Sequence, residues 1–156
     1  MEAWVKTSTG GDSNYRGLIS TEDSTGNGWG LMVRNSTWWV DFGSGTKWNT
    51  GQAVTLDVWQ HLAVVFEPGE LVRFYLNGSE ILSPYQPTFL VNDSSLTLGR
   101  RANYAYDWAS FNGLLDEVTI YAQPLSATQI QEHLRNGVQI FEELDTGLNP
   151  DSDYTY

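Results

Sequence analysis

Residues 59–81, WQHLAVVFEPGELVRFYLNGSEI, constrain the fold more than any other stretch of the chain. They predict three antiparallel strands joined by turns at Pro68-Gly69 and Asn77-Gly78, both of which are typical reversal sequences. A meander of this size is not stable alone, so a second sheet must cover its apolar face. That face is predicted from every second residue of the first two strands: Leu62, Val64, Phe66, Val72, Phe74 and Leu76.

Short alternating segments separated by polar, Gly-rich loops recur through the rest of the chain. Residues 17–20 are expected to pair with an opening strand at residues 1–7. A hairpin is expected about Asn35-Ser36, with Trp38, Val40 and Phe42 on one face of it and Trp39 and Asp41 on the other. Further segments are expected to be strands at 96–98 and 114–121, loops at 43–52 and 100–112, and a proline-containing crossing segment at 85–88.

One short helix is expected near the C-terminus. Ser126 and Gln129 form a capping box, Ile130 and Leu134 form a buried stripe, and Gly137 is the expected stop signal. Residues 1–146 are therefore interpreted as one domain and 147–156 as an acidic linker or tail. The pattern predicts an all-β fold, a two-sheet antiparallel jelly-roll sandwich with this helix appended.

Composition limits the possible partners. The chain of 156 residues has a formal net charge of −11 and only eight Lys and Arg residues, which argues against binding to nucleic acid or to anionic membrane surfaces. No apolar run reaches transmembrane length, so no membrane insertion is expected. The absence of cysteine excludes a disulfide scaffold and a thiolate metal site.

The central meander and the segment 96–134 together resemble the laminin G-like branch of the concanavalin A-like lectin/glucanase superfamily, over residues 1 to about 137. This resemblance implies a domain of a larger secreted or cell-surface protein, with its opening strand or strands missing upstream of Met1 and an internal strand left as an unpaired edge. The residues that carry it are Trp59, His61, Ala63, Tyr75, Asn77, Gly78, Leu98, Gly99, Phe111, Gly113, Asp116, Glu117, Val118, Pro124, Leu125 and Ser126.

Asp116 is the candidate metal ligand. It shares strand parity with Leu114 and Val118 and is therefore expected to point toward the apolar interior. A buried carboxylate must be satisfied, either by backbone N–H groups of a neighbouring loop or by a structural calcium ion. Because calcium sites occur in many domains of the superfamily that this chain resembles, calcium at Asp116 is the functional alternative.

The loop at residues 100–113 is the candidate ligand site. Its flat aromatic rings and charged side chains are of the kind that recognises sugars, and Trp48 on another loop is a second possible stacking surface. The alternative is that these rings only cover one end of the sandwich. The candidate residues are Arg100, Arg101, Tyr104, Tyr106, Asp107 and Trp108. Trp4, Trp38, Trp59 and His61, all on strands, are interpreted as structural.

Catalysis is not expected. Glycosidases place two carboxylates across the substrate, whereas Asp116 and Glu117 are adjacent on a strand, where alternation gives them opposite faces. The sequence thus predicts a non-catalytic carbohydrate-binding or adhesion module that binds a glycan or an extracellular protein and accompanies other domains of a parent chain. The alternatives are a structural spacer without sugar binding and, as a distant third, the remnant of a glycoside hydrolase.

Overall fold

The structure is a computed structural model, and it describes residues 1–23, 25–43, 45–67, 69–83, 86, 94–102, 104 and 107–147, without the side chains of 107 and 138–147. The crossing segment predicted at 85–88, apart from Gln86, and the tail predicted at 147–156, apart from Gly147, lie outside these residues. Among the described residues, no helix is both long enough and apolar enough to cross a bilayer.

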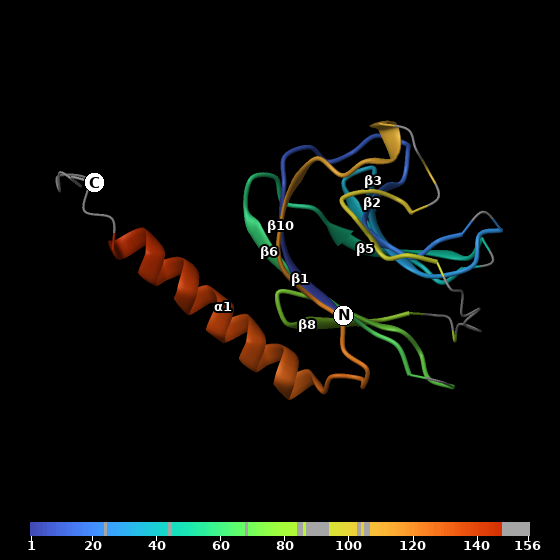
Figure 1. The fold of residues 1–156 in the computed structure, drawn as a ribbon. Helices are drawn as coiled ribbons and strands as arrows, with labels where there is room; N and C mark the ends of the chain where they lie inside the picture. Colours follow the sequence, from blue (N-terminus) through green and yellow to red (C-terminus); the bar gives the residue numbers. More distant parts are fainter. Residues whose placement is uncertain are drawn as a thin grey trace.

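Two antiparallel five-stranded sheets face each other (Figure 1), which confirms the jelly-roll sandwich predicted from the sequence. The first, called here the helix-side sheet, has the order β10 (Gly113–Thr119), β1 (Glu2–Thr7), β6 (Trp59–Val65), β7 (Arg73–Leu76) and β8 (Ser79–Leu82). The second, called here the open sheet, has the order β5 (Lys47–Ala53), β4 (Thr37–Asp41), β3 (Gly30–Arg34), β2 (Arg16–Ser20) and β9 (Thr97–Leu98).

The inward faces of the two sheets make one core. Alternate residues of the central strands are fully buried there, as the apolar alternation predicts; examples are Val5 on β1, Val33 on β3 and Leu62 on β6. The tight turns also follow the prediction, since Asn35 and Asn77 have φ of 47° and Gly69 has φ of 82°. The burial of these side chains holds the two sheets together and orients their outer faces in opposite directions.

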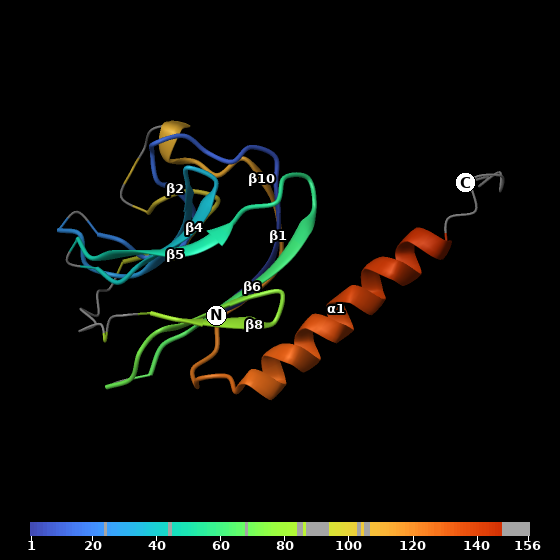
Figure 2. The ribbon, with the colours of Figure 1, turned by 180° about the vertical axis from the view of Figure 1, so that it is seen from behind.

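Helix α1 (Ala127–Gly147) packs its first half on the outer face of the helix-side sheet. Figure 2 shows that the rest of the helix extends away from the sandwich. The predicted capping box is present, because Gln129 N–H donates to Ser126 Oγ at 3.3 Å and Ser126 N–H donates to Gln129 Oε1 at 2.9 Å. Ile130 is fully buried against Ala63 and Tyr75 of the sheet.

The helix is longer than predicted, because Gly137 does not end it. Gly137 is buried inside the helix, and a Cβ atom there would lie 2.4 Å from Trp4 Nε1. The glycine therefore serves close packing of helix on sheet rather than a left-handed stop. The expectation of a short helix is wrong in this respect, and residues 138–147 are helical.

One pairing expectation is also wrong. β2 does not pair with β1; it belongs to the other sheet, between β3 and β9. β1 is hydrogen-bonded to both β10 and β6 and so has no free side for β2. The edges of the helix-side sheet are β10 and β8.

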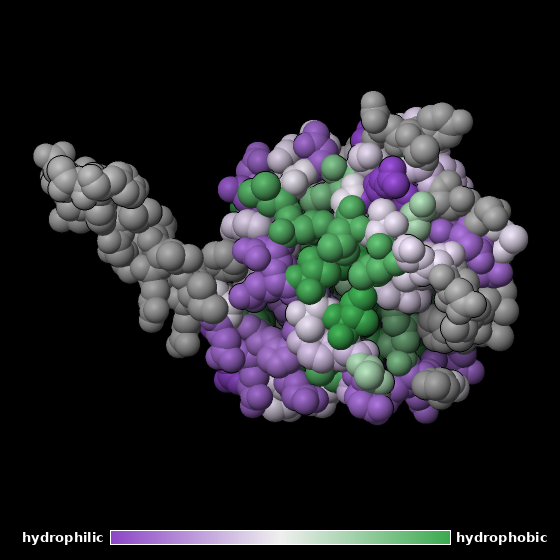
Figure 3. Space-filling view, in the orientation of Figure 1, coloured by the Kyte–Doolittle hydropathy of each residue, from purple (hydrophilic) through white to green (hydrophobic). Residues whose placement is uncertain are grey.

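A hydrophobic surface patch lies over β10 in the view of Figure 3. The large apolar side chains that the structure leaves exposed include Leu114 on β10, Ile120 just after it and Leu98 on β9, each about half exposed. Among the described strands, β10 and β9 are edge strands of the two sheets, and both leave apolar side chains exposed.

Candidate functional site

The outer face of the open sheet carries a group of aromatic and charged side chains in mutual contact. On β4, Trp38 and Val40 are buried in the core, so Trp39 and Asp41 between and beside them face outward. Trp39 stands opposite Asn49 of β5, and Asp41 stands opposite Lys47. Strand alternation alone therefore brings an indole, a carboxylate and an ammonium group to one surface.

Tyr15, which immediately precedes β2, is the centre of this surface. Its ring meets that of Trp39 edge to face, with centroids 5.3 Å apart and an interplanar angle of 84°. The guanidinium of Arg34 lies 4.4 Å from the Tyr15 ring centroid and donates to the Tyr15 hydroxyl at 2.7 Å. Lys47 Nζ and Arg101 Cζ are 5.6 Å and 5.7 Å from the same centroid. Three cations thus surround one ring.

Two buried carboxylates balance these cations. Arg101 donates to both oxygens of Glu22, with distances of 2.6 to 3.0 Å, and both side chains are almost fully buried. Lys47 Nζ lies 2.7 Å from Asp41 Oδ2 and 4.0 Å from Glu22 Oε1. Bidentate pairing compensates for the desolvation of the Glu22 and Arg101 charges and fixes the direction of the guanidinium.

The loop after β9 brings the last two rings to this surface. Arg101 Cζ lies 3.9 Å from the ring centroid of Tyr104, which in turn meets Trp108 at 5.4 Å between centroids. Trp108 is 38% exposed. We call this surface the platform; it consists of Tyr15, Glu22, Arg34, Trp39, Asp41, Lys47, Arg101, Tyr104 and Trp108.

Gly17 of β2 allows the loop to reach the sheet. A Cβ atom at Gly17 would lie 2.4 Å from both Arg100 C and Arg101 N, which are backbone atoms. The loop is held there because Gly99 N–H donates to Leu18 O at 2.7 Å and Arg16 Nη1 donates to Ser110 O at 3.2 Å. Any side chain at position 17 would displace the loop that carries Arg101, Tyr104 and Trp108.

The predicted site residues have different outcomes. Arg101, Tyr104 and Trp108 meet on the platform, as expected of one loop. Arg100 is exposed beside it and forms a backbone bridge with Ser110. Tyr106 and the side chain of Asp107 lie outside the described residues. The expectation for Trp48 is wrong.

Trp48 lies on β5 rather than on a loop, and its side chain is in the core. It stacks on Phe42, with centroids 6.5 Å apart and an interplanar angle of 22°, and it meets Phe74 edge to face. The glycines around it resemble a loop sequence, but pairing with β4 imposes strand geometry.

Sequence reasoning did not select the platform residues that lie outside the 100–113 loop: Tyr15, Glu22, Arg34, Trp39, Asp41 and Lys47. The parity of β4 was a usable signal for Trp39 and Asp41, because it already placed them opposite the buried Trp38 and Val40. No local signal relates Tyr15 or Glu22 to Arg101, since 79 residues separate Glu22 from Arg101.

Asp116 does not point into the core, which corrects the prediction. Glu117 has φ of 47°, and the pairing of β10 with β1 shifts register between Glu2 and Trp4, so a bulge breaks the alternation. Asp116 is exposed and accepts a hydrogen bond at 2.8 Å from the N–H of Glu117. Within the described residues, no three or more His, Cys, Asp or Glu side chains are grouped to hold a metal ion. Calcium at Asp116 stays a prediction.

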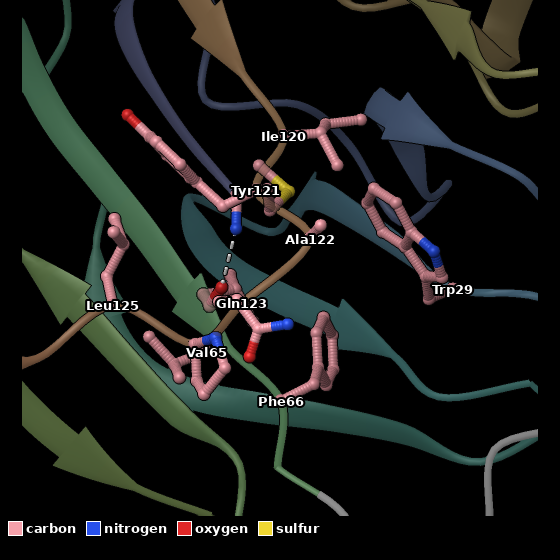
Figure 4. A pocket seen from close by; sticks show the side chains of 11 residues that line it. Trp29, Val65, Phe66, Ile120, Tyr121, Ala122, Gln123 and Leu125 are labelled. Atoms are coloured by element: carbon pink, nitrogen blue, oxygen red, sulfur yellow. Dashed lines mark hydrogen bonds between the residues drawn. The ribbon is translucent and has the colours of Figure 1, made fainter.

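A separate cavity of about 340 Å³ lies at one end of the sandwich, between the end of β6 and residues 120–125. Figure 4 shows Trp29 and Phe66 on one side of it and Val65 and Leu125 on the other, with Gln123 between them. The rings of Trp29 and Phe66 are 6.1 Å apart. The cavity is mostly apolar and contains none of the platform residues.

The fold is a two-sheet antiparallel β-sandwich, and comparison with known families gives its class. The Laminin_G_3 family model, described as the Concanavalin A-like lectin/glucanases superfamily, matches residues 1–131. The chain belongs to this family, which confirms the resemblance inferred from its motifs. No curated protein sequence matches the chain.

Several solved structures share the fold. Domain 4 of AbnA, an extracellular GH43 arabinanase from Geobacillus stearothermophilus solved with arabinotriose, is 24% identical with a TM-score of 0.62, over 84% of this chain and 63% of that one. A putative carbohydrate-binding protein from Bacteroides ovatus is 19% identical with a TM-score of 0.67, over 84% and 39%. The CBM40 of a Ruminococcus gnavus IT-sialidase, bound to α2,3-sialyllactose, is 16% identical with a TM-score of 0.66, over 85% and 80%. The chain thus spans less than two thirds of the first two, and at these identities the likeness establishes the fold.

Proposed function

We propose that the protein is a non-catalytic carbohydrate-binding module of a larger secreted or cell-surface protein, and that the platform binds the glycan. The observation that carries this proposal is the partly exposed set of rings around Tyr15, with Trp39 and Trp108, held among cations and carboxylates. Aromatic faces stack on the C–H faces of sugar rings, and charged side chains bind hydroxyl groups strongly. The printed ligands of similar folds, arabinotriose and sialyllactose, support a sugar as the partner.

The same geometry supports a binding role over hydrolysis. Glu22 and Asp41 are neighbours across Lys47, so they resemble a carboxylate pair. A glycosidase needs one of its two acids to donate a proton to the leaving group. Both oxygens of Glu22 accept hydrogen bonds from Arg101, and Asp41 is paired with Lys47, so neither side chain is available for that step.

Affinity electrophoresis against neutral and acidic polysaccharides tests the proposal. We expect a defined subset to retard the protein, and Trp39→Ala and Trp108→Ala to weaken that binding by about tenfold or more, as buried aromatic anchors do. Trp29→Ala is the matched control, because it removes the same side chain from the cavity of Figure 4. Repeating the run with chelator tests calcium, since retardation that survives chelation would remove the metal from the account.

The rival role is a spacer or protein-adhesion module, in which the rings of the platform only hold the 100–110 loop on the sheet. That role predicts no retardation by any polysaccharide and a large drop in melting temperature for Trp108→Ala. Loss of binding in Trp29→Ala, with Trp39→Ala unaffected, would instead move the sugar site from the platform to the apolar cavity.

A further inference from the structure

A second cavity, of about 390 Å³, lies between the outer face of the helix-side sheet and helix α1, on the side of the sandwich opposite the platform. Nine residues line it: Glu2, Trp4, His61, Glu117, Thr119, Tyr121, His133, Asn136 and Gly137. The chain has only two histidines, and both are here. The glycan site proposed above uses none of these residues.

Only one of the two carboxylate oxygens of Glu2 has hydrogen-bond partners. Glu2 is 6% exposed, and its Oε1 accepts from the Tyr121 hydroxyl at 2.5 Å and lies 2.8 Å from His133 Nδ1. Its Oε2 is buried without a hydrogen-bond partner, and the nearest cation-forming group, His61 Nε2, is 3.6 Å away. A buried carboxylate oxygen in this state is costly unless a donor reaches it.

His61 has the same deficit. It is 1% exposed, and its Nδ1 is buried without a hydrogen-bond partner. If Nε2 carries the proton that faces Glu2, Nδ1 is an acceptor. The unsatisfied acceptor that faces Nε2 is then Glu2 Oε2, whereas Nδ1 points to the other side of the ring, and Glu117, which is exposed, adds a second carboxylate to the cavity. What this site lacks is a hydrogen-bond donor, preferably a charged one.

The side chains that line the cavity and the net charge of the protein indicate which kind of donor can bind. The indole of Trp4, tilted against His61 at 5.2 Å, and the phenol ring of Tyr121 provide surfaces for a carbon skeleton and for a cation. The net charge of −11 attracts cations to the molecule. In the described part of the chain, no acid or histidine side chains form a group suited to a metal ion. These facts favour an organic cation.

We infer that this cavity binds a small molecule bearing a protonated primary amine, whose N–H groups donate to Glu2 Oε2 while Glu117 faces its charge. The volume of about 390 Å³ admits a skeleton of sugar size. Helix α1 completes the site, because Gly137 packs directly on Trp4 and His133 binds Glu2.

D-glucosamine and D-glucose are the matched probes, since they differ by one ammonium group in place of a hydroxyl. Titration of the full chain at neutral pH is followed by the imidazole NMR signals, which two histidines make simple to assign. We expect glucosamine to shift the signals of His61 and His133 saturably, and glucose to bind about tenfold more weakly or not at all.

Three variants test the placement. Glu2→Gln should abolish the shifts, and Glu117→Gln, which changes an exposed residue and does not endanger the fold, should weaken binding about tenfold. Glu70→Gln removes the same charge from an exposed site outside the cavity and should change nothing. Trp39→Ala should also leave these shifts intact, which separates this site from the platform.

Equal shifts with glucosamine and glucose, or no saturable shift with either, would overturn the inference and leave ordered water as the donor. An equal loss in Glu117→Gln and Glu70→Gln would overturn it too, because the general negative field would then explain the binding. Neither result would affect glycan binding at the platform, which is measured by Trp39→Ala on polysaccharide.

Discussion

The outer faces of the two sheets contain similar chemistry but differ in how it is covered. Each has a buried carboxylate, Glu2 on one face and Glu22 on the other, that meets cation-forming and aromatic side chains. On the helix-side sheet the outward residues of β6 and β7 include the apolar side chains of Ala63, Val65 and Tyr75, and helix α1 buries them. On the open sheet the outward residues include the charged and aromatic side chains of the platform, and the rings of Tyr15, Trp39 and Trp108 are partly exposed.

The difference shows when the outer face of a sheet must be covered by a further layer. An apolar outer face must be covered to remove its area from water, so the helix is part of the core packing. A face whose charges are paired within the sheet needs no second layer, so its rings stay accessible to a partner. The predictions below test whether the two faces act independently, with stability depending on the helix-side face and glycan binding on the open face.

The largest effect on stability is expected for Glu2→Ala. It leaves the Tyr121 hydroxyl and His133 without their shared acceptor and opens space under the helix, at a cost of about 2–4 kcal/mol in the free energy of unfolding. Urea unfolding measures this cost, and glycan binding by the folded fraction should not change. Glu132→Ala, an exposed change on the same helix, is the control and should stay within about 0.5 kcal/mol. Equal effects of the two substitutions would contradict the structural role of Glu2.

A smaller loss of stability, combined with a loss of binding, is expected for Gly17→Ala. The added methyl group meets the backbone of residues 100 and 101 and must displace the loop, which costs about 1–3 kcal/mol and moves Arg101 and Trp108. Gly30→Ala on the neighbouring strand is the control, because its nearest contact is 3.3 Å and its φ is not positive. If Gly17→Ala retained full glycan binding, the loop would not be part of the site.

The smallest effect is expected in the dependence of stability on pH. Burial alone would raise the pKa of Glu2, but its interactions with His61, Tyr121 and His133 outweigh burial and lower that pKa. A lowered pKa means that the native state binds fewer protons than the unfolded state near the ordinary carboxyl pKa. The contribution of Glu2 is therefore present above that pKa and is lost as the pH falls through the native value.

The pKa of Tyr121 is shifted in the opposite direction, so its effect on stability depends on pH in the opposite way. Burial, followed by its hydrogen bond to Glu2, raises the pKa of Tyr121 to about 12. Its contribution is complete below pH 10, the ordinary value, and is lost as the pH rises toward about 12. Melting temperatures measured on the acid limb and the alkaline limb of the stability–pH profile test these two pH dependences. Glu2→Gln should flatten the acid limb and Tyr121→Phe part of the alkaline limb, whereas platform substitutions should alter neither.

The sequence by itself determined the local features. The meander, the Asn35-Ser36 hairpin and the Ser126 capping box depend on alternation, turn residues and a short-range hydrogen bond, all of which lie within a few positions of each other. For the same reason, the loop that carries Tyr104 and Trp108 was identified as a candidate site. The family motifs pointed to the sandwich because they contain these same local signals.

Tertiary structure decided the features that depend on distant partners. β2 pairs in the open sheet because β1 is already paired on both sides, and no property of residues 17–20 specifies that. Gly137 lies within the helix because the indole of Trp4 packs where a side chain at position 137 would be. Both ionic clusters join residues 79 or more positions apart, Glu22 with Arg101 and Glu2 with His133. Sequence patterns report the preferences of neighbouring residues, whereas these contacts form only when the two sheets and the helix have packed.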